Sequence, residues 1–503
     1  MSGRQQNTTI QDALDLALKH HQAGRLSDAE DIYEQILQTD PKQPVALHLL
    51  GVTSHQVGKN DVAVDLITKA LDLEPNYPEA HNNLGLALQA LNRPTEAIKS
   101  YRLALSLRGD YADAYSNLGD SLQFIGKHAD AVFSYRKALN INPGYSLALN
   151  NLGNALQELG QLDKAVASYK ASLKLNPNYA AAHNNLGNAL RRLGKLEEAV
   201  ASYRQGLTLE TTSAKLYSNL GEALRDVAYR MIEKLQCRDY IANENKPRPE
   251  ETEQDDIWDD VDDCANQALK IVANDTQALA LKAAALIGKD RLDKWSNLCD
   301  FNRLIQTHII DAPVGHNDLR SFNKALLERC ANDESRIFEV PGKAITNGER
   351  VNSLHMDATS SPVSPLLRYV DGLAKKYAAE HPIDPHHPFL AKTPKTWRIS
   401  AWSSILRKQG YHEPHIHKVG WLSGVYYGRL PDVMGTNDEK QQGCIEFGRP
   451  INYVSSGNNP QFHVLRPKEG MVVLFPAYFY HRTIPFDTDD TRFTVAFDLI
   501  PLS

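Results

Sequence analysis

Residues 150–183 read NNLGNALQELGQLDKAVASYKASLKLNPNYAAAH, and the chain then starts again, because residues 184–190 read NNLGNAL. The same register recurs every 34 residues through the first half of the chain. Its glycines are Gly51, Gly85, Gly119, Gly153, Gly187 and Gly221, and its tyrosines are Tyr101, Tyr135, Tyr169 and Tyr203. Self-similarity at a fixed period of this length is typical of stacked supersecondary units.

The residue types in this register suit pairs of antiparallel helices. A small glycine and a small alanine let two helices approach closely, and the tyrosine fills the groove behind them. A second glycine (Gly126, Gly160, Gly194) stands where the first helix of a pair must turn into the second. Pro75, Pro143 and Pro177 close the units, because proline cannot continue a helix. The pattern predicts an all-α solenoid.

These repeats resemble the tetratricopeptide repeat (TPR), whose 34-residue period and alternation of small and large residues they reproduce. We assign residues 10–237 to a TPR solenoid of about six to seven repeats. The resemblance implies a concave groove that binds a protein or peptide, which we take as the partner.

One register is not explained by packing. An asparagine precedes the Leu-Gly of five consecutive repeats: Asn83, Asn117, Asn151, Asn185 and Asn219. These residues are either solvated helix positions that tolerate asparagine after duplication, or a ladder that binds an extended peptide backbone through amides that donate and accept. The ladder is similar to that in the repeats of O-linked N-acetylglucosamine transferases.

The repeat pattern then degrades. Residues 238–257 are rich in acidic residues and contain Pro247 and Pro249, which predicts a disordered acidic insertion. Residues 258–300 restore a helical pattern, and we assign them to the last repeat helix and to capping helices.

After about residue 300 the period changes. An amphipathic helix is predicted over residues 363–378, and from Trp397 onward short β-rich runs such as GWLSGVYYGRL, GMVVLFP and RFTVAFDLI alternate with turn residues. Many short strands with Gly and Pro turns indicate a sandwich or barrel. Residues 301–503 are therefore expected to form a separate β-rich domain.

Residues with metal and acid chemistry gather in this half. His415 and His417 have the spacing that places two side chains on one face of a strand. His481 follows the apolar strand GMVVLFP, and histidine is the commonest ligand for iron, zinc or copper. Arg492 lies inside a strand that looks half-buried, where it requires a carboxylate partner. Asp490, Asp498 or an external acid are the candidates.

Residues 397–500 resemble a bacterial and phage group of iron(II)/2-oxoglutarate-dependent oxygenases. The motifs are PHIH (414–417), GWLSGVYYG (420–428), GCIEFG (443–448), EGMVVLFPAYFYH (469–481) and RFTVAF (492–497). The resemblance implies a double-stranded β-helix, or jelly roll, flanked by helices. It also implies Fe(II), 2-oxoglutarate and O2 as cofactor and cosubstrates, with ascorbate as a further candidate.

Carried over by motif, His415 and His481 are metal ligands, and Arg492 binds the far carboxylate of 2-oxoglutarate. The family usually has an acidic residue where this chain has His417. The second ligand is therefore His417 itself in a three-histidine catalytic site, a carboxylate from elsewhere such as Glu446, or water.

Together these features predict a 2-oxoglutarate oxygenase that hydroxylates a side chain of a protein or peptide held by the TPR groove. The alternatives are a TPR scaffold with an inactive oxygenase-like domain, and a cupin-like metal enzyme that does not use 2-oxoglutarate. A net charge of −6 argues against nucleic acid as a partner. Five scattered cysteines without a CxxC, no apolar leader and no long apolar run favour a cytoplasmic protein without a membrane segment.

Overall fold

The structure is a computed structural model, which describes residues 2–241, 251–311, 316–338, 345–354, 361–432, 440–454 and 460–502. The side chains of residues 2–9, 235–241, 251–255, 345, 347, 353 and 408 are not described. The chain forms two compact units, residues 1–209 and residues 210–503.

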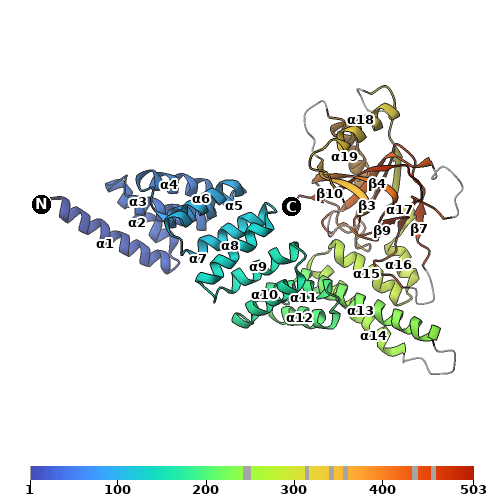
Figure 1. The fold of residues 1–503 in the computed structure, drawn as a ribbon, viewed down its shortest axis with the longest axis horizontal. Helices are drawn as coiled ribbons and strands as arrows, with labels where there is room; N and C mark the ends of the chain where they lie inside the picture. The colour runs from blue at the N-terminus through green and yellow to red at the C-terminus, as the bar shows by residue number, and fades with distance from the viewer. Residues whose placement is uncertain are drawn as a thin grey trace. The chain divides into compact units, whose positions relative to one another are not determined.

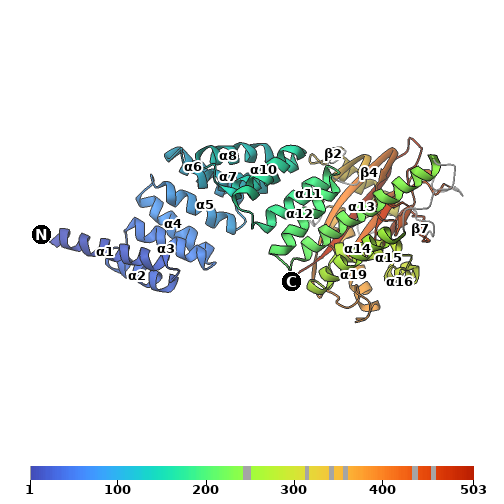
Figure 2. The same ribbon diagram turned by 90° about the horizontal axis from the view of Figure 1, so that it is seen from below.

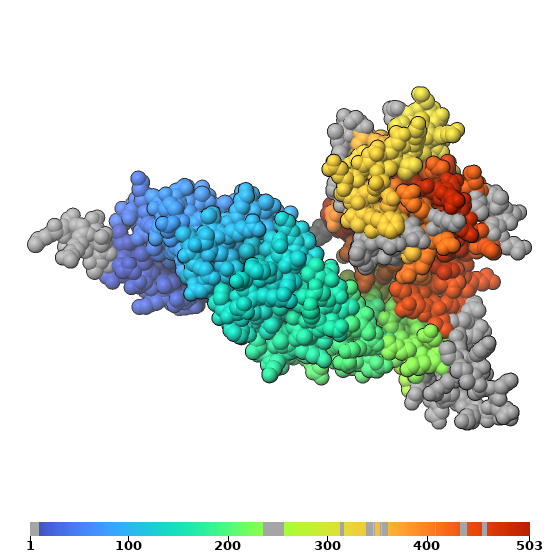
Figure 3. All heavy atoms as spheres, in the orientation of Figure 1, coloured from blue at the N-terminus to red at the C-terminus, as the bar shows by residue number. Residues whose placement is uncertain are grey.

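The first unit consists of paired antiparallel helices, as the repeat pattern predicts (Figure 1). The helices are α1 (Ser2–Gln22), α2 (Leu26–Thr39), α3 (Pro44–Gln56), α4 (Asn60–Leu73), α5 (Pro78–Ala90), α6 (Pro94–Leu107), α7 (Ala112–Phe124), α8 (His128–Ile141), α9 (Ser146–Glu158), α10 (Leu162–Leu175), α11 (Ala180–Arg192) and α12 (Leu196–Leu209). Successive pairs lie against one another in chain order, from blue to green in the space-filling view (Figure 3).

Contact between a glycine and a tyrosine sets the helix spacing in this unit. A Cβ atom added at Gly153 would lie 2.5 Å from the ring of Tyr169, and one at Gly187 would lie 2.5 Å from the ring of Tyr203. The buried hydroxyl of Tyr169 donates a hydrogen bond to Asn154 at 2.8 Å. Gly160 and its equivalents adopt positive φ between the two helices of a pair, which is the predicted turn.

The second unit begins with five helices, of which all but the last lie in the region that the sequence assigned to the repeats and their capping helices. These are α13 (Ala214–Ile241), α14 (Glu251–Ile271), α15 (Thr276–Gly288), α16 (Leu292–Leu298) and α17 (Phe301–Leu304). They pack against the β-domain: Arg225 donates to the hydroxyl of Tyr480 at 2.6 Å, and Thr276 donates to the carbonyl of Gly420 at 3.0 Å. Figure 2 shows α13 and α14 lying side by side.

The predicted disordered insertion at residues 238–257 is wrong where the structure describes it. Helix α13 continues to Ile241, and α14 already begins at Glu251. Trp258, Val261 and Ala265 recur at helical spacing and are fully buried, so they provide the packing that holds α14. Glutamate and glutamine are good helix formers, and acidic residues suit a first helical turn. Residues 242–250 lie outside the described part of the chain.

The rest of this unit is the predicted jelly roll with flanking helices. Its larger sheet has the order β1-β8-β5-β10-β4-β3-β2 and its smaller sheet the order β7-β6-β9, with every pairing antiparallel. The strands are β1 (Gln306–Ile309), β2 (Ile337–Phe338), β3 (Ile345–Leu354), β4 (Trp397–His412), β5 (Leu422–Arg429), β6 (Ile445–Phe447), β7 (His463–Leu465), β8 (Met471–Pro476), β9 (His481–Thr483) and β10 (Arg492–Pro501).

Two further helices, α18 (Leu319–Ala331) and α19 (Val363–Glu380), cover these strands, and α19 contains the predicted amphipathic helix. Their apolar faces join one buried core with α15, α16 and the larger sheet. None of the described helices combines the length and apolarity that a membrane span requires. No disulfide joins the described cysteines, which are Cys264, Cys299, Cys330 and Cys444, and all four are buried.

Replacing Gly153 by alanine should destabilise the repeat unit by roughly 1–3 kcal/mol, because the new methyl group collides with the buried ring of Tyr169. Urea unfolding of the full chain, followed by circular dichroism, measures the loss in free energy of unfolding. Gly109→Ala is the matched control, since a Cβ there has no neighbour within 4 Å. Equal effects of the two substitutions would contradict the role of the Gly–Tyr contact.

Candidate metal centre

The segment that carries His415 and His417 is held against the start of β9 by main-chain hydrogen bonds. The N–H of His415 donates to the carbonyl of His481, and the N–H of His481 donates to the carbonyl of His415, both at 3.1 Å. The N–H of His417 donates to the carbonyl of Ala477, also at 3.1 Å. This short antiparallel bridge joins two segments from distant parts of the β-domain.

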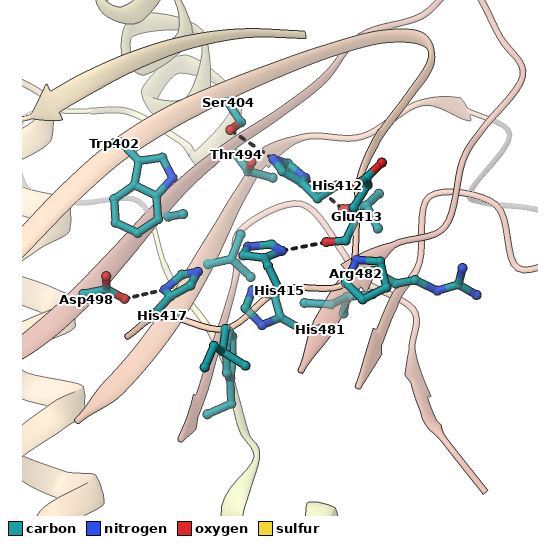
Figure 4. A pocket seen from close by; sticks show the side chains of 18 of the residues that line it. Trp402, Ser404, His412, Glu413, His415, His417, His481, Arg482, Thr494 and Asp498 are labelled. Atoms are coloured by element: carbon teal, nitrogen blue, oxygen red, sulfur yellow. Dashed lines mark hydrogen bonds and ion pairs between the residues drawn. The ribbon is translucent and has the colours of Figure 1, made fainter. Parts of the chain in front are cut away.

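The bridge brings the three imidazoles together between the two sheets (Figure 4). The ring centroids lie 4.3 Å apart for His415 and His481, and 4.9 Å apart for His417 and His481. One nitrogen from each ring can be chosen so that all three lie within 4.8 Å of one another. No other group of three potential metal ligands of this kind occurs in the described part of the chain.

Each of the three rings has an acceptor at its Nδ1 atom. His415 Nδ1–H donates to the carbonyl of Glu413 at 2.7 Å, and His481 Nδ1–H donates to the carbonyl of Phe479 at 3.0 Å. His417 Nδ1–H donates to the carboxylate of Asp498 at 2.5 Å. Metal-binding histidines typically donate their second nitrogen in this way, which fixes the tautomer and leaves Nε2 as the ligand atom.

The surroundings keep the imidazoles of His415 and His481 neutral. Burial lowers the pKa of His415 to about 3, and the nearby imidazole of His417 contributes in the same direction. Burial, together with His415, holds the pKa of His481 well below its ordinary value. Neutral imidazole is the form that binds a metal, so His415 and His481 require no deprotonation near neutral pH. The donor set fits one divalent transition-metal ion.

Arg492 lies in the same cavity and has no carboxylate partner in the described part of the chain. The residue is only 2% exposed, and its Nε has no hydrogen-bond partner. Its guanidinium centre lies 5.1 Å from the ring centroid of Tyr427. The two acids considered from the sequence are engaged elsewhere, Asp490 with Arg429 and Asp498 with His417. Burial without a counter-ion lowers the pKa of Arg492.

Strand alternation explains how β10 supplies this wall. Every second residue of the strand faces the cavity: Arg492, Thr494, Ala496 and Asp498. The cavity has a volume of about 770 Å³, within the range usual for small-molecule sites. A cationic group therefore stands at one end of this strand and a carboxylate that orients His417 at the other.

The alternative ligand Glu446 does not join the histidine cluster. Its carboxylate forms ion pairs with Arg449, at 2.8 Å, and with Arg482. The neighbouring Phe447 packs toward His481, with ring centroids 6.2 Å apart, so Glu446 lies on the opposite face of β6. Alternation along this three-residue strand excludes the predicted carboxylate ligand.

Sequence reasoning missed two residues that line the cavity. His412, which no motif singles out, accompanies the cluster, with its ring centroid 6.0 Å from that of His415 and its Nδ1 3.1 Å from the hydroxyl of Thr483. Arg350 reaches the cavity from β3. β4 extends from Trp397 to His412, and β3 lies before the β-rich runs in the sequence. Strand alternation indicates these positions only once the pairing of β3, β4 and β10 is known, and the sequence does not supply that pairing.

The asparagine register makes hydrogen bonds between repeats. Asn83 donates to His48 at 2.9 Å, Asn117 to Asn82 at 3.0 Å, Asn151 to Asp120 at 2.9 Å and Asn185 to Asn150 at 3.1 Å. In the second unit, Asn219 accepts from Gln277 at 3.2 Å. The amides thus form hydrogen bonds that link neighbouring repeats. Neither interpretation drawn from the sequence, a solvated position or a peptide-binding ladder, included this role. A role in binding a peptide stays a prediction.

The comparisons with known proteins agree with this architecture. Residues 400–498 match the family model described as "Putative 2OG-Fe(II) oxygenase", and residues 76–144 and 150–213 match models described as tetratricopeptide repeat. The chain therefore combines tetratricopeptide repeats with a 2OG-Fe(II) oxygenase domain, which confirms the two resemblances drawn from the motifs.

Among solved structures, the chain is similar to the MamA protein at 29% identity, covering 35% of this chain and 96% of that chain with a TM-score of 0.31. It is also similar to pilF of Pseudomonas aeruginosa at 19% identity, covering 42% of this chain and 96% of that chain with a TM-score of 0.39. No curated protein matches the chain.

Replacing Asp498 by alanine should weaken binding of a divalent metal by roughly ten- to one-hundred-fold, because His417 loses the acceptor that orients its ring. Titration of the metal-free protein with Co(II), followed by its visible absorption, measures the affinity. Asp490→Ala is the matched control, as this acid pairs with the exposed Arg429 near the start of the same strand. Unchanged affinity in Asp498→Ala would show that the Asp498–His417 contact does not support a metal site.

Proposed function

We propose that this protein is an Fe(II)- and 2-oxoglutarate-dependent dioxygenase that hydroxylates a side chain of a protein or peptide recruited by the TPR groove. One observation carries the proposal: three imidazoles can bring one ring nitrogen each within 4.8 Å of one another, in a cavity that also holds a buried arginine with no counter-ion among the described residues. The first feature fits a metal ion, and the second fits an acid that the protein does not itself supply.

The residues fit the cofactor and cosubstrate that the oxygenase family implies. His415, His417 and His481 would hold the iron, and Arg492 would pair with the far carboxylate of 2-oxoglutarate. When bound, ferrous iron supplies the activation of O2, so that 2-oxoglutarate is converted to succinate and CO2 while one oxygen atom is inserted into a C–H bond of the substrate.

The protein's own residues position the reactants and limit side reactions. Asp498 fixes the ring of His417, and it also accepts a hydrogen bond from Ser423 at 2.6 Å, which keeps the carboxylate in place. Phe475 packs against the ring of His481 with centroids 4.7 Å apart, which shields that side of the site from water. Arg492 is held ready before any ligand arrives, because its strand is paired on both sides.

Two alternatives deserve comparison. In a cupin-like metal enzyme that does not use 2-oxoglutarate, no ligand would pair with the buried charge of Arg492. A TPR scaffold with an inactive oxygenase-like domain would not need the Nδ1 acceptors that orient all three rings. The arrangement of these four side chains therefore supports an active oxygenase over both.

With Fe(II), ascorbate and O2, the purified protein should convert 2-oxoglutarate to succinate even without a substrate, at a slow rate. Arg492→Gln should raise the KM for 2-oxoglutarate by roughly ten-fold or more, because a desolvated charge pair is lost, while metal affinity is kept. His481→Ala should lose both metal binding and turnover.

Arg429→Gln is the control for Arg492→Gln, since Arg429 pairs with Asp490 at the surface. Metal binding without any succinate release, with or without added peptides, would favour the inactive scaffold. Turnover of 2-oxoglutarate that is indifferent to Arg492 would disprove the role given to this residue.

For the repeats, the double variant Asn151→Ala with Asn185→Ala should weaken capture of protein substrates and leave the uncoupled decay of 2-oxoglutarate intact. Captured proteins are identified by crosslinking to the full chain, and hydroxylation is detected as the mass of one added oxygen atom. Because these amides also bond to Asp120 and Asn150, unfolding must be measured beside capture. Asn178→Ala, at an exposed loop position, is the control. Undiminished capture would contradict the ladder.

A further inference from the structure

Besides Arg492, two more guanidinium groups line the cavity: Arg482 pairs with Glu446, and the other, that of Arg350, is not used by the proposed reaction. Arg350 on β3 lines the same cavity as the three histidines and Arg492. In the sheet, Arg350 lies opposite Ser404 of β4, and Ser404 lies opposite Thr494 of β10. With strands spaced about 4.8 Å apart, the main chain at Arg350 is roughly 10 Å from that of β10. The two arginines therefore occupy separate positions on one wall.

Arg350 is held in place by an aromatic ring. Its guanidinium centre lies 4.6 Å from the ring centroid of Trp402, and that ring lies 5.3 Å from the ring of His417. Stacking on tryptophan fixes the plane of the guanidinium while leaving its edge N–H groups free to bind a planar partner. Trp402 thus links Arg350 to the proposed metal ligands.

The charge of Arg350 is not compensated within the described part of the chain. Its Nε is buried without a hydrogen-bond partner, and no described carboxylate forms an ion pair with it. Asp498 attracts it from a distance but is bound to His417 and Ser423. Glu413, the other acid lining the cavity, is exposed and pairs with neither arginine. Burial lowers the pKa of Arg350 to about 10, so the group remains charged at neutral pH.

Arg350 and Arg492 are two unpaired guanidinium groups in one cavity, and the cosubstrate can pair with only one of them. 2-Oxoglutarate has one carboxylate beyond the end that would bind the metal, and Arg492, which is almost completely buried, is placed to receive it. An unsatisfied buried cation is costly unless a ligand pairs with it. The polar neighbours of Arg350 in the cavity wall, Asn352 and Ser404, carry no charge. Arg350 is therefore available to pair with the carboxylate of a second ligand.

We propose that Arg350, stacked on Trp402, binds a carboxylate of the substrate, so that the preferred target is an aspartate or glutamate side chain of the recruited protein. This inference rests on the proposed function and names the substrate class of the same site. A carboxylate held by Arg350 would place the neighbouring C–H groups on the side of the cavity where Trp402 meets His417.

Binding can be tested without turnover. The full-length protein is loaded with Zn(II) and 2-oxoglutarate, and two pools of fluorescent peptides are titrated by anisotropy. One pool has a central Asp or Glu among random flanking residues, and the other has Asn or Gln at the same position. We expect the acidic pool to bind roughly ten-fold or more tightly than the amide pool. Arg350→Gln should remove that preference, and Arg350→Lys should keep part of it.

Arg407→Gln is the matched control, since Arg407 lies on the neighbouring strand and pairs with Glu349 at the surface. Arg350→Glu should reverse the preference toward a pool with central lysine. Unchanged Zn(II) affinity and circular dichroism show that each variant is folded.

Equal binding of the acidic and amide pools by the parent protein would overturn the inference, as would a preference that survives in Arg350→Gln. A rise in the KM for 2-oxoglutarate in Arg350→Gln as large as that in Arg492→Gln would assign Arg350 to the cosubstrate and also overturn it. If succinate is never released but the acidic preference depends on Arg350, the proposed oxygenase activity fails while the acid-binding site stands.

Discussion

The pair of main-chain hydrogen bonds between His415 and His481 is the contact on which the rest of the site depends. It joins the segment after β4 to the start of β9, and so connects the larger sheet to the smaller one at the point where the histidines project. Side chains at fixed positions on paired backbones cannot drift apart without breaking the pairing. The short distances between the imidazoles are therefore a consequence of sheet register and need no metal to hold them.

A second constraint is the uncompensated charge in the cavity. The acids near the site are already committed, Asp498 to His417, Asp490 to Arg429 and Glu446 to two arginines of its own. Arg350 and Arg492 are consequently left facing the cavity. Evolution can remove a buried unpaired cation by a single substitution, so its presence is best understood as preparation for an anionic ligand. By the same reasoning, the three histidines suit a metal ion and the two arginines suit acids.

The sequence predicted the repeats well because their physics is local. A glycine at one position and a tyrosine sixteen residues later form one contact inside one helical pair, and repetition makes the pattern visible. The histidines and Arg492 could be found because family motifs carry them. Glu446, His412 and Arg350 could not be placed, since their surroundings depend on which face of a strand meets the cavity and on pairing between distant strands. The start of α14 was not predicted as helix because the acidic residues dominate its sequence. The few apolar residues that hold the helix, among them Trp258 and Val261, lie on its buried face.

The asparagine register shows why a recurring residue need not have one purpose. Each primary amide offers two donors and an acceptor with two lone pairs, and the bonds between repeats use only part of that capacity. The amide of Asn151, for example, donates one hydrogen bond to Asp120, whose carboxylate also accepts a hydrogen bond from the hydroxyl of Tyr135. A residue that fixes the pitch between repeats would also fix the spacing of its remaining polar atoms. Regular spacing is what an extended peptide backbone requires of a binding surface, so the structural role in the stack is compatible with the proposed role in binding.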